Sequence, residues 1–465
     1  MHLPIDYIPK KVSILGAARS GLATAKFLGE KGIAVFLSDA CPAQQLEKTL
    51  IANKCDHFPH EAGGHTKRAL DADVIVLSPG VPSDLPIVRQ AQTNGIAVWS
   101  EIELAYRFTK GKYLAVTGST GKSTTVSFLG SIMEAAHASF VVAGNIGIPL
   151  IGVVPALGAD AFIVAEISSF QLETIDCFRP RVSMVLNLLK NHLDRYENEQ
   201  AYYDAKKAIA VNATQEDFVV LNANDPLLVE WARSLRRRTN IVWFGSPRDK
   251  SISSEGVWSE DGALISTIGG VREHLLDVAS MKLHGRHNHE DACAAAAAAK
   301  LAGVKSDAIA SGLSAFAGLE HRLEFVAEIG GVRYYNDSKS TTAESVASAV
   351  EAFENNVFLI AGGRDKGCDF ASIKDAVARH AKGIVLIGEA AKRIQGEWAG
   401  CAPITMAGSL EQALDNVHRA ALSGDVVVFS PGCSSFDMFR NFEHRGEVFK
   451  GLVKRLKAEG VQNHA

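Results

Sequence analysis

The chain has 465 residues, 47% hydrophobic and 22% charged, an ordinary globular composition that excludes a wholly disordered, collagenous or coiled-coil protein. At roughly 150 residues per domain, this length predicts about three domains. The 48 basic and 52 acidic residues give a net charge of −4, so no field of one sign would draw the chain to nucleic acid or to an anionic membrane.

Cysteine usage and the N-terminus indicate the compartment. The seven cysteines are scattered and contain no Cys-x-x-Cys pair, which argues against a disulfide framework or a thiolate zinc site. The opening MHLPIDYIPKK has an acid and prolines where a signal peptide needs an apolar core. No run approaches the roughly 18 apolar residues of a membrane helix. These features predict a cytoplasmic protein without membrane insertion.

Short Val-, Ile- and Leu-rich runs alternate with longer helical patterns, which predicts an α/β fold with largely parallel sheets. Ser/Gly turns and short β-type runs at 250–280 break this pattern and predict a small antiparallel excursion, and the alanine-rich run 291–300 predicts a helix. The expected strands are 12–15, 34–37, 74–77, 113–117, 162–166, 183–187, 218–221, 357–361, 383–387 and 426–430.

A glycine turn follows the first expected strand. Gly16, Ala18 and Gly21 stand where a Rossmann dinucleotide fingerprint has three glycines, and Asp39 ends the next strand near the position of a ribose-binding acid. Ala18 crowds the backbone where a pyrophosphate would approach. NAD or FAD binding, a nucleotide with its phosphate elsewhere and a purely structural turn therefore stay open.

The strongest single motif is YLAVTGSTGKSTT at 113–125, where an apolar strand runs into a glycine turn and then a helix. Such a turn presents backbone N–H groups and a helix N-terminus to a polyphosphate. Lys122 would reach the β- and γ-phosphates, and the Ser123 hydroxyl would ligate Mg²⁺. Val116 stands where the strict pattern has glycine, so the match is to a shortened form, TGxxGKST. ATP use is favoured over a chance strand–turn–helix junction.

Further segments follow this motif in a fixed order. Glu166 ends a strand, as a Walker-B-type metal ligand would, while His192 follows another strand and Lys206 lies on a helix after it. Taken alone, Glu166 could cap a turn and His192 could be structural. The other segments are AGNIGIPL at 143–150, GLEHRLEFV at 318–326, YYNDSKSTT at 334–342, AGGRDKGCDF at 361–370 and SPGCSSFDMFRNFEHRGEVF at 430–449.

With these motifs in this order over essentially its whole length, the sequence resembles the Mur ligase family. The resemblance implies an α/β protein of three domains. Residues 1–108 would form a Rossmann-like domain that binds a UDP-substrate, and 109–319 a central P-loop ATPase-type domain with a mostly parallel sheet. Residues 320–465 would form a Rossmann-like C-terminal domain that binds the amino acid and closes on ATP.

The resemblance also implies a reaction in peptidoglycan precursor synthesis. ATP would phosphorylate the carboxylate of UDP-N-acetylmuramoyl-L-alanine, and the amine of D-glutamate would attack the acyl phosphate. Two Mg²⁺ ions would let the two anions meet, one held by Ser123 and Glu166, the other by His192 and a carbamylated Lys206. Small-molecule substrates would be the only partners, with no nucleic acid, and the enzyme would be a monomer.

The same resemblance assigns residues to each substrate. Catalysis would rest on Lys122, Glu166, His192 and Lys206. ATP would contact Gly118, Ser119, Thr120, Gly121, Lys122, Ser123, Thr124, Asn288, Arg322 and Asp337. The UDP-substrate would contact Arg19, Ser20, Asp39, Asn145 and His192. Glutamate would contact Lys339, Lys366, Ser435 and Phe442, since lysine and hydroxyl donors suit two carboxylates.

The chain departs from the family pattern at two places. Ser119 and Thr120 replace Thr and Asn in the family loop TGTNGKST, but both are small and polar. Asp291 stands where the HNxxN element has its second asparagine, which leaves the role of Asp291 open and makes Asn288 the expected nucleotide contact.

Alternatives remain at this point. A folylpolyglutamate synthase would lack the unit of about 108 residues that precedes the P-loop strand, and SFDMFRNFEHRG favours a glutamate-adding enzyme. A related ligase that adds L-glutamate or another amino acid stays open, because chirality is not legible from these residues. A nucleotide-regulated binding protein is the other class, although it would not need a two-metal site.

Overall fold

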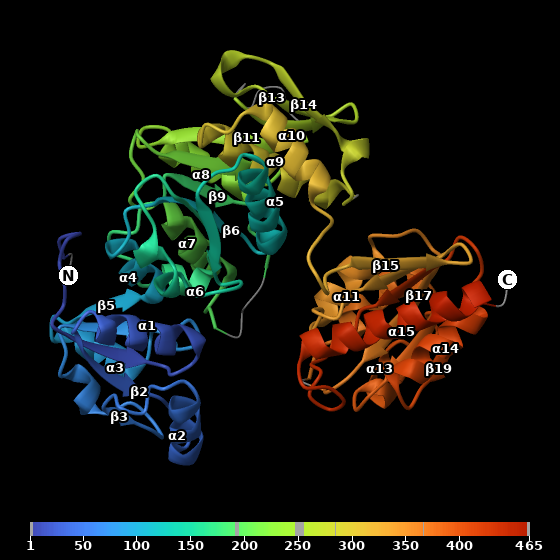
Figure 1. The fold of residues 1–465 in the computed structure, drawn as a ribbon, viewed down its shortest axis with the longest axis horizontal. Helices are drawn as coiled ribbons and strands as arrows, with labels where there is room; N and C mark the ends of the chain where they lie inside the picture. Colours follow the sequence, from blue (N-terminus) through green and yellow to red (C-terminus); the bar gives the residue numbers. More distant parts are fainter. Residues whose placement is uncertain (1–2, 191–194, 247–254, 284, 366, 463–465) are drawn as a thin grey trace. The chain divides into compact units, whose positions relative to one another are not determined.

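The computed structural model describes residues 3–190, 195–246, 255–283, 285–365 and 367–462 (Figure 1). The chain forms two compact units, Met1–Phe316 and Ala317–Ala465. The first unit contains two β-sheets and the second contains one. Each sheet has helices around it, which confirms the α/β class and the arrangement in three sheet-centred domains. The boundaries at 108 and 319 stay predictions.

The first sheet has five parallel strands in the order β3-β2-β1-β4-β5. This order matches the Rossmann order 3-2-1-4-5-6 without its last strand. In such sheets ligands bind where the strand order reverses, which here is beside β1 and β4. The strands are β1 (Lys11–Leu15), β2 (Ala34–Ser38), β3 (His60–Glu61), β4 (Val74–Leu77) and β5 (Ala97–Ser100). The helices are α1 (Arg19–Glu30), α2 (Ala43–Ala52), η1 (Lys67–Leu70), α3 (Pro86–Thr93) and α4 (Glu101–Arg107).

The second sheet has nine strands in the order β14-β13-β12-β11-β10-β9-β6-β8-β7. Neighbours from β7 to β12 are parallel, whereas β12, β13 and β14 pair antiparallel, which confirms the expected excursion. The strands are β6 (Lys112–Thr117), β7 (Phe140–Gly144), β8 (Phe162–Glu166), β9 (Val182–Val185), β10 (Phe218–Asn222), β11 (Asn240–Gly245), β12 (Gly256–Glu260), β13 (Ala263–Ser266) and β14 (Glu273–Asp277). Because β6 lies between β8 and β9, the carboxyl ends of these three strands meet.

Helix α5, which follows the P-loop, is held by two neighbours that pack against it (Figure 1). In α9 the residues 292–299 are seven alanines and one cysteine, all fully buried, and their small side chains let α9 lie close to α5 and the sheet. On α10, a Cβ added at Gly312 would lie 2.5 Å from the Cα of Ile132 in α5. The helices of this part are α5 (Lys122–Ala135), α6 (Ser169–Leu172), α7 (Glu199–Lys207), α8 (Pro226–Leu235), α9 (Arg286–Leu301) and α10 (Ser306–Ala315), with short 3-10 turns that include η2 (Leu150–Gly152).

The second unit has six strands in the order β15-β16-β20-β17-β18-β19, parallel except for the β15–β16 pair. Helices α14 and α15 pack side by side on it (Figure 1). Its elements are β15 (Glu324–Ile329), β16 (Val332–Asn336), α11 (Ala343–Val350), β17 (Val357–Gly362), α12 (Lys374–His380), β18 (Ala381–Ile387), α13 (Ala391–Glu397), β19 (Ile404–Met406), α14 (Leu410–Ala420), β20 (Val426–Phe429) and α15 (Phe442–Gln462). Across the described residues, no helix combines the length and apolar character needed to cross a membrane.

Candidate active site

The P-loop joins β6 to α5 through residues 118–121, as predicted. Gly118 and Gly121 have φ angles of +153° and +82°, a region that side chains with a Cβ rarely adopt. A Cβ at Gly118 would also lie 3.0 Å from Cβ of Leu186. The loop therefore needs glycine at both positions. Because the first amides of a helix have no partner within it, α5 presents N–H groups and positive potential at the loop.

Asn187 fixes the shape of this loop, and the sequence did not single it out. Its Oδ1 accepts hydrogen bonds from the amides of Ser119 and Thr120 at 3.0 and 2.9 Å. The predicted strand 183–187 is wrong at its end, because β9 stops at Val185 and Asn187 turns to the loop instead of pairing with a strand. Its position directly beyond a strand adjacent to β6 is the signal that could have identified it.

Replacing Asn187 with alanine should raise the KM for ATP about tenfold, because two amides of the loop lose their shared acceptor. The KM for the expected UDP-substrate should change by less than about twofold, since the side-chain hydrogen bonds of Asn187 to described residues go to the P-loop. Steady-state kinetics with each substrate varied in turn measures this difference. Equal increases for all substrates would show that Asn187 supports the fold in general and not the nucleotide site.

Glu166, at the end of β8, brings three predicted residues together. It is 3% exposed. The Ser123 hydroxyl donates to its Oε2 at 2.7 Å, and the Asn145 amide group donates to its Oε1 at 2.8 Å. The backbone N–H of Asn145 also donates to the Glu166 carbonyl at 2.8 Å. These residues meet because they follow or end the neighbouring strands β6, β7 and β8. A buried carboxylate beside a hydroxyl is a donor set suited to Mg²⁺.

Lys206, on α7, reaches the same loop. Its Nζ donates to the Gly118 carbonyl at 2.9 Å, and Lys122 donates to that carbonyl at 2.7 Å. Lys206 is 2% exposed, and its Nζ lies 4.5 Å from the centre of the Tyr202 ring. Burial, followed by the charge of Lys122, lowers the pKa of Lys206 to about 6, although Glu166 acts in the opposite direction. At neutral pH this amine is therefore largely uncharged.

Two of the predicted catalytic and binding residues fall outside the described residues. His192, expected as a metal ligand and substrate contact, lies in 191–194, and Lys366, expected at the glutamate site, is the single position between 365 and 367. Their assignments stay predictions.

Three of the predicted UDP-substrate residues, Arg19, Ser20 and Asp39, lie at or beside the glycine turn after β1. Asp39 accepts the amides of Ala17 and Cys41 at 2.6 and 2.8 Å. Burial raises the pKa of Asp39, but these hydrogen bonds outweigh it and hold the pKa below its usual value. Asp39 therefore stays ionised and orders the turn. Arg19 is exposed and Ser20 half-buried at the start of α1.

The first turns of α9 lie beside the P-loop. A Cβ added at Gly121 would lie 2.4 Å from Oδ1 of Asp291, so the buried Asp291 carboxylate contacts the N-terminus of α5. Asn288, one turn earlier in α9, is half-buried. The structure therefore places Asp291, whose role the sequence left open, at the nucleotide loop.

In the second unit, Asp337 follows β16 and is buried. It accepts hydrogen bonds from the hydroxyls of Ser340 and Ser430 and from the amide of Leu323 at 3.1 Å. Burial raises the pKa of Asp337 to about 6, and these hydrogen bonds and the nearby charge of Arg322 limit the increase. Arg322 and Asp337, both predicted ATP contacts, are therefore neighbours.

The predicted glutamate residues of this unit lie on loops that Arg445 connects. The buried Arg445 guanidinium donates to the Ser338 carbonyl at 2.7 Å and to the Cys433 carbonyl at 3.0 Å. The half-buried Lys339 follows Ser338, and the buried Ser435 follows shortly after Cys433. The Ser338 hydroxyl also donates to the carbonyl of Phe442, the half-buried first residue of α15, at 2.8 Å.

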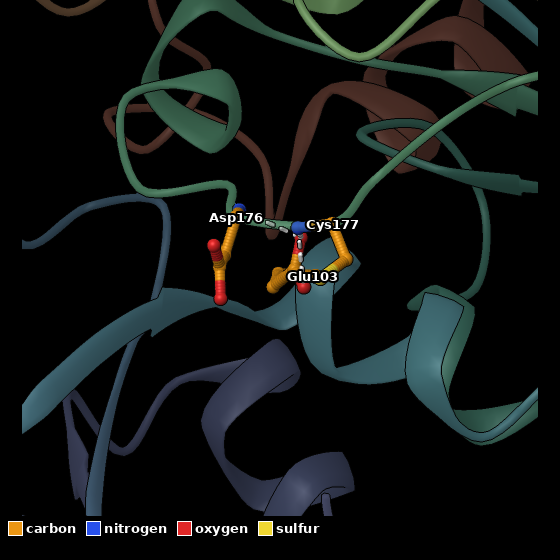
Figure 2. Close-up of side chains that lie close together, drawn as sticks. All are labelled: Glu103, Asp176 and Cys177. Carbon is orange, nitrogen blue, oxygen red and sulfur yellow. Dashed lines mark hydrogen bonds between the residues drawn. The ribbon is translucent and has the colours of Figure 1, made fainter. Parts of the chain in front are cut away.

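Figure 2 shows a further cluster, Glu103, Asp176 and Cys177, whose spacing could admit a metal ion. Glu103 is already satisfied, because it accepts the amides of Asp176, Cys177 and Phe178 at 2.8–3.0 Å. Its other neighbour is Arg107, which donates to it at 2.7 Å. Glu103 therefore clamps the chain at 176–178, and the cluster is structural.

Three family models match the chain: "Mur ligase MurD-like, N-terminal domain" over residues 10–100, "Mur ligase middle domain" over 116–299 and "Mur ligase, glutamate ligase domain" over 321–433. Among curated proteins, the UDP-N-acetylmuramoylalanine–D-glutamate ligase of Acidobacterium capsulatum is 42% identical, with 96% of each chain covered. The ligase of the same name from Pelotomaculum thermopropionicum is also 42% identical, with 97% of this chain and 99% of the relative covered.

Solved structures share the fold. A MurF ligase from Thermotoga maritima, in complex with ADP, aligns with a TM-score of 0.59 at 15% identity and covers 91% of this chain and 96% of its own. A UDP-N-acetylmuramate–alanine ligase from the same organism aligns with a TM-score of 0.55 at 18% identity, covering 97% of this chain and 100% of its own. At these identities the likeness concerns the fold alone.

Proposed function

The chain belongs to the Mur ligase family, and we propose that it catalyses the ATP-dependent addition of D-glutamate to UDP-N-acetylmuramoyl-L-alanine. Its relatives of about 40% identity are UDP-N-acetylmuramoylalanine–D-glutamate ligases. ATP phosphorylates the carboxylate of UDP-N-acetylmuramoyl-L-alanine. The amine of D-glutamate then attacks the acyl phosphate and forms the amide, releasing phosphate. The product is a peptidoglycan precursor.

The observation that carries this proposal is the meeting of Lys122, Ser123, Glu166 and Lys206 at one P-loop. Phosphoryl transfer to a carboxylate brings two anions together, so it needs fixed positive charge and ordered oxygen ligands. Lys122 extends over the loop through its contact with the Gly118 carbonyl and can turn from it to a phosphate. A nucleotide-binding protein without catalytic activity would need the P-loop, but it would not need the buried Glu166 and Lys206 beside it.

The donor set fits Mg²⁺. The Ser123 hydroxyl and the Glu166 carboxylate are adjacent hard oxygen ligands, and Glu166 is buried with neutral hydrogen-bond donors on both oxygens. When bound, Mg²⁺ would reduce the repulsion between the γ-phosphate and the attacking carboxylate. We assign a first ion to Ser123 and Glu166, and a second to His192 and Lys206.

Lys206 can serve as a ligand only if it loses its positive charge. No ion pair of Lys206 is found within the described part of the chain, and its amine faces the P-loop carbonyl. With a pKa of about 6, the buried amine is free to react with CO₂ at neutral pH. The resulting carbamate would be an anion with two oxygens, which would suit a ligand of Mg²⁺. We therefore propose that Lys206 is carbamylated.

The two ends of the UDP-substrate would lie on different elements of the first unit. Arg19, Ser20 and Asp39 would hold the UDP end at the turn after β1, and Asn145 would hold the reacting end beside Glu166. The proposed further contacts of ATP are Asn288 in the first unit and Arg322 and Asp337 in the second. Glutamate would be bound by Lys339, Lys366, Ser435 and Phe442.

Phosphate release tests the function directly. We expect release that depends on UDP-N-acetylmuramoyl-L-alanine, D-glutamate and Mg²⁺ together, with mass spectrometry showing the amide product. L-Glutamate in place of D-glutamate is the matched control. Activity with L-glutamate alone would identify a ligase of the opposite stereochemistry, and absence of release with either would favour a nucleotide-binding protein. We also expect the enzyme to be cytoplasmic and monomeric. Size-exclusion chromatography with light scattering tests whether it is a monomer.

A further inference from the structure

Glu101 is a buried carboxylate that the reaction described so far does not use. It is the first residue of α4, directly after β5 at the edge of the first sheet. It is 1% exposed, and burial raises its pKa to about 7. A carboxylate kept at this depth costs free energy unless its partners compensate for lost hydration. The contacts of Glu101 therefore indicate what it is retained for.

One side of Glu101 holds the start of η2. Its Oε1 accepts the amide of Ile151 at 2.7 Å. Helix η2 packs against both α4 and α1. Glu101 thus fastens the chain just after the loop 145–149 to the two helices of the first domain.

The same loop is fastened at its other end by Glu166. Asn145 donates to Glu166 through both its side chain and its backbone, as described above. The N–H of Gly144, just before this loop, donates to the Ile148 carbonyl at 2.9 Å, and the Ile148 side chain is 55% exposed. Two buried carboxylates therefore hold a short loop whose middle faces solvent and whose first residue is the proposed contact of the reacting end.

Two further groups, Arg19 and Tyr113, interact electrostatically with Glu101. Arg19, at the start of α1, lies close enough for its charge to lower the pKa of Glu101 against the effect of burial. The buried hydroxyl of Tyr113, in β6, lies close enough for Glu101 to raise the pKa of that tyrosine. Within the described residues, neither Glu101 Oε2 nor the Tyr113 hydroxyl has a hydrogen-bond partner. Among the described residues, Glu101 is thus held by hydrogen bonding through Oε1, while its buried Oε2 accepts none.

We propose that Glu101 is a positioning residue for the UDP-substrate, which fixes the loop 145–149 against α1 and α4. This inference rests on the proposed function. One carboxylate then sets the distance between the group that holds the UDP end, Arg19, and the group that holds the reacting end, Asn145. Without Glu101, Arg19 and Asn145 would still be present, but the distance between them would no longer match the two ends of one extended substrate.

Glu101→Ala tests this role. We expect the KM for UDP-N-acetylmuramoyl-L-alanine to rise about tenfold, since the hydrogen bond that holds the end of the loop is lost. The KM values for ATP and D-glutamate should change by less than about twofold. Glu101→Gln should restore the KM to within about threefold, because its amide oxygen can still accept the Ile151 N–H. If Glu101→Ala does not fold, Glu101→Asp, which withdraws the carboxylate by one methylene, should raise the same KM.

Glu103 provides the matched control. It lies on the same helix and is equally buried, but it holds residues 176–178 (Figure 2). Glu103→Gln should lower the melting temperature and leave the KM for the UDP-substrate unchanged. In an Asn145→Ala background, the effect of Glu101→Ala on this KM should shrink, because Glu101 acts through the loop that begins at Asn145.

The outcomes separate the inference from the function on which it rests. An inactive wild-type protein would contradict the proposed function. An active wild type with a Glu101→Ala variant that binds the UDP-substrate equally well, or that weakens all three substrates alike, would contradict the positioning role alone.

Discussion

Replacing Lys122 with alanine should abolish turnover while the UDP-substrate still binds. The γ-phosphate and the attacking carboxylate lose their nearest fixed cation, and removal of one such donor costs roughly 10³-fold in kcat, or about 4 kcal/mol. Lys206 cannot replace it, because a buried amine with a pKa of about 6 carries little charge at pH 7. Phosphate release measures the loss, and calorimetric titration with UDP-N-acetylmuramoyl-L-alanine measures the retained binding.

Lys112→Ala is the control for this experiment. Lys112 begins the same strand, β6, but is exposed at its amino end, away from the loop. Its removal should leave kcat unchanged. Equal loss of UDP-substrate binding in Lys122→Ala would contradict the assignment of that substrate to the turn after β1 and to Asn145.

The parts of the site that follow strands were predictable from the sequence. Ser123, Asn145 and Glu166 stand just beyond or at the ends of runs of Val, Ile and Ala, and parallel strands bring such positions to one edge. Once β6, β7 and β8 are neighbours, the contacts of Glu166 with Ser123 and Asn145 follow. Local pattern and sheet topology therefore account for this half of the site.

The contacts made across helices were not predictable in the same way. Asp291 reaches Gly121 only because the alanine face of α9 packs closely on α5, and this packing distance is a tertiary property. Asn187 was overlooked because its expected strand was extended by two residues, which hid its turn toward Ser119. Glu101 belongs to none of the motifs that the sequence shows. Its position depends on where η2 meets α1 and α4, which no local spacing encodes.

Lys206→Arg should be nearly inactive although it keeps a positive charge. In the wild type the amine is 2% exposed and largely neutral at pH 7, so CO₂ can convert it to an anion that suits a metal site. A guanidinium stays charged and cannot form the carbamate, so it would place a cation where an anionic ligand is needed. We expect a loss of roughly 10³-fold in kcat, similar to that of other essential electrostatic groups.

The neighbouring Lys207 distinguishes this chemistry from a general need for lysine on α7. Lys207 pairs with Asp204 at 3.6 Å, so Lys207→Arg should keep its ion pair and its activity. The carbamate also has a direct signature: protein equilibrated with ¹³C-bicarbonate should give a carbamate carbon signal by NMR that is absent from Lys206→Arg. As the pH falls through about 6 the amine becomes protonated, so this signal and the activity should decline together and return on neutralisation. An active Lys206→Arg enzyme, or a wild type that is active without the signal, would show that Lys206 works unmodified, as a hydrogen-bond donor to the P-loop.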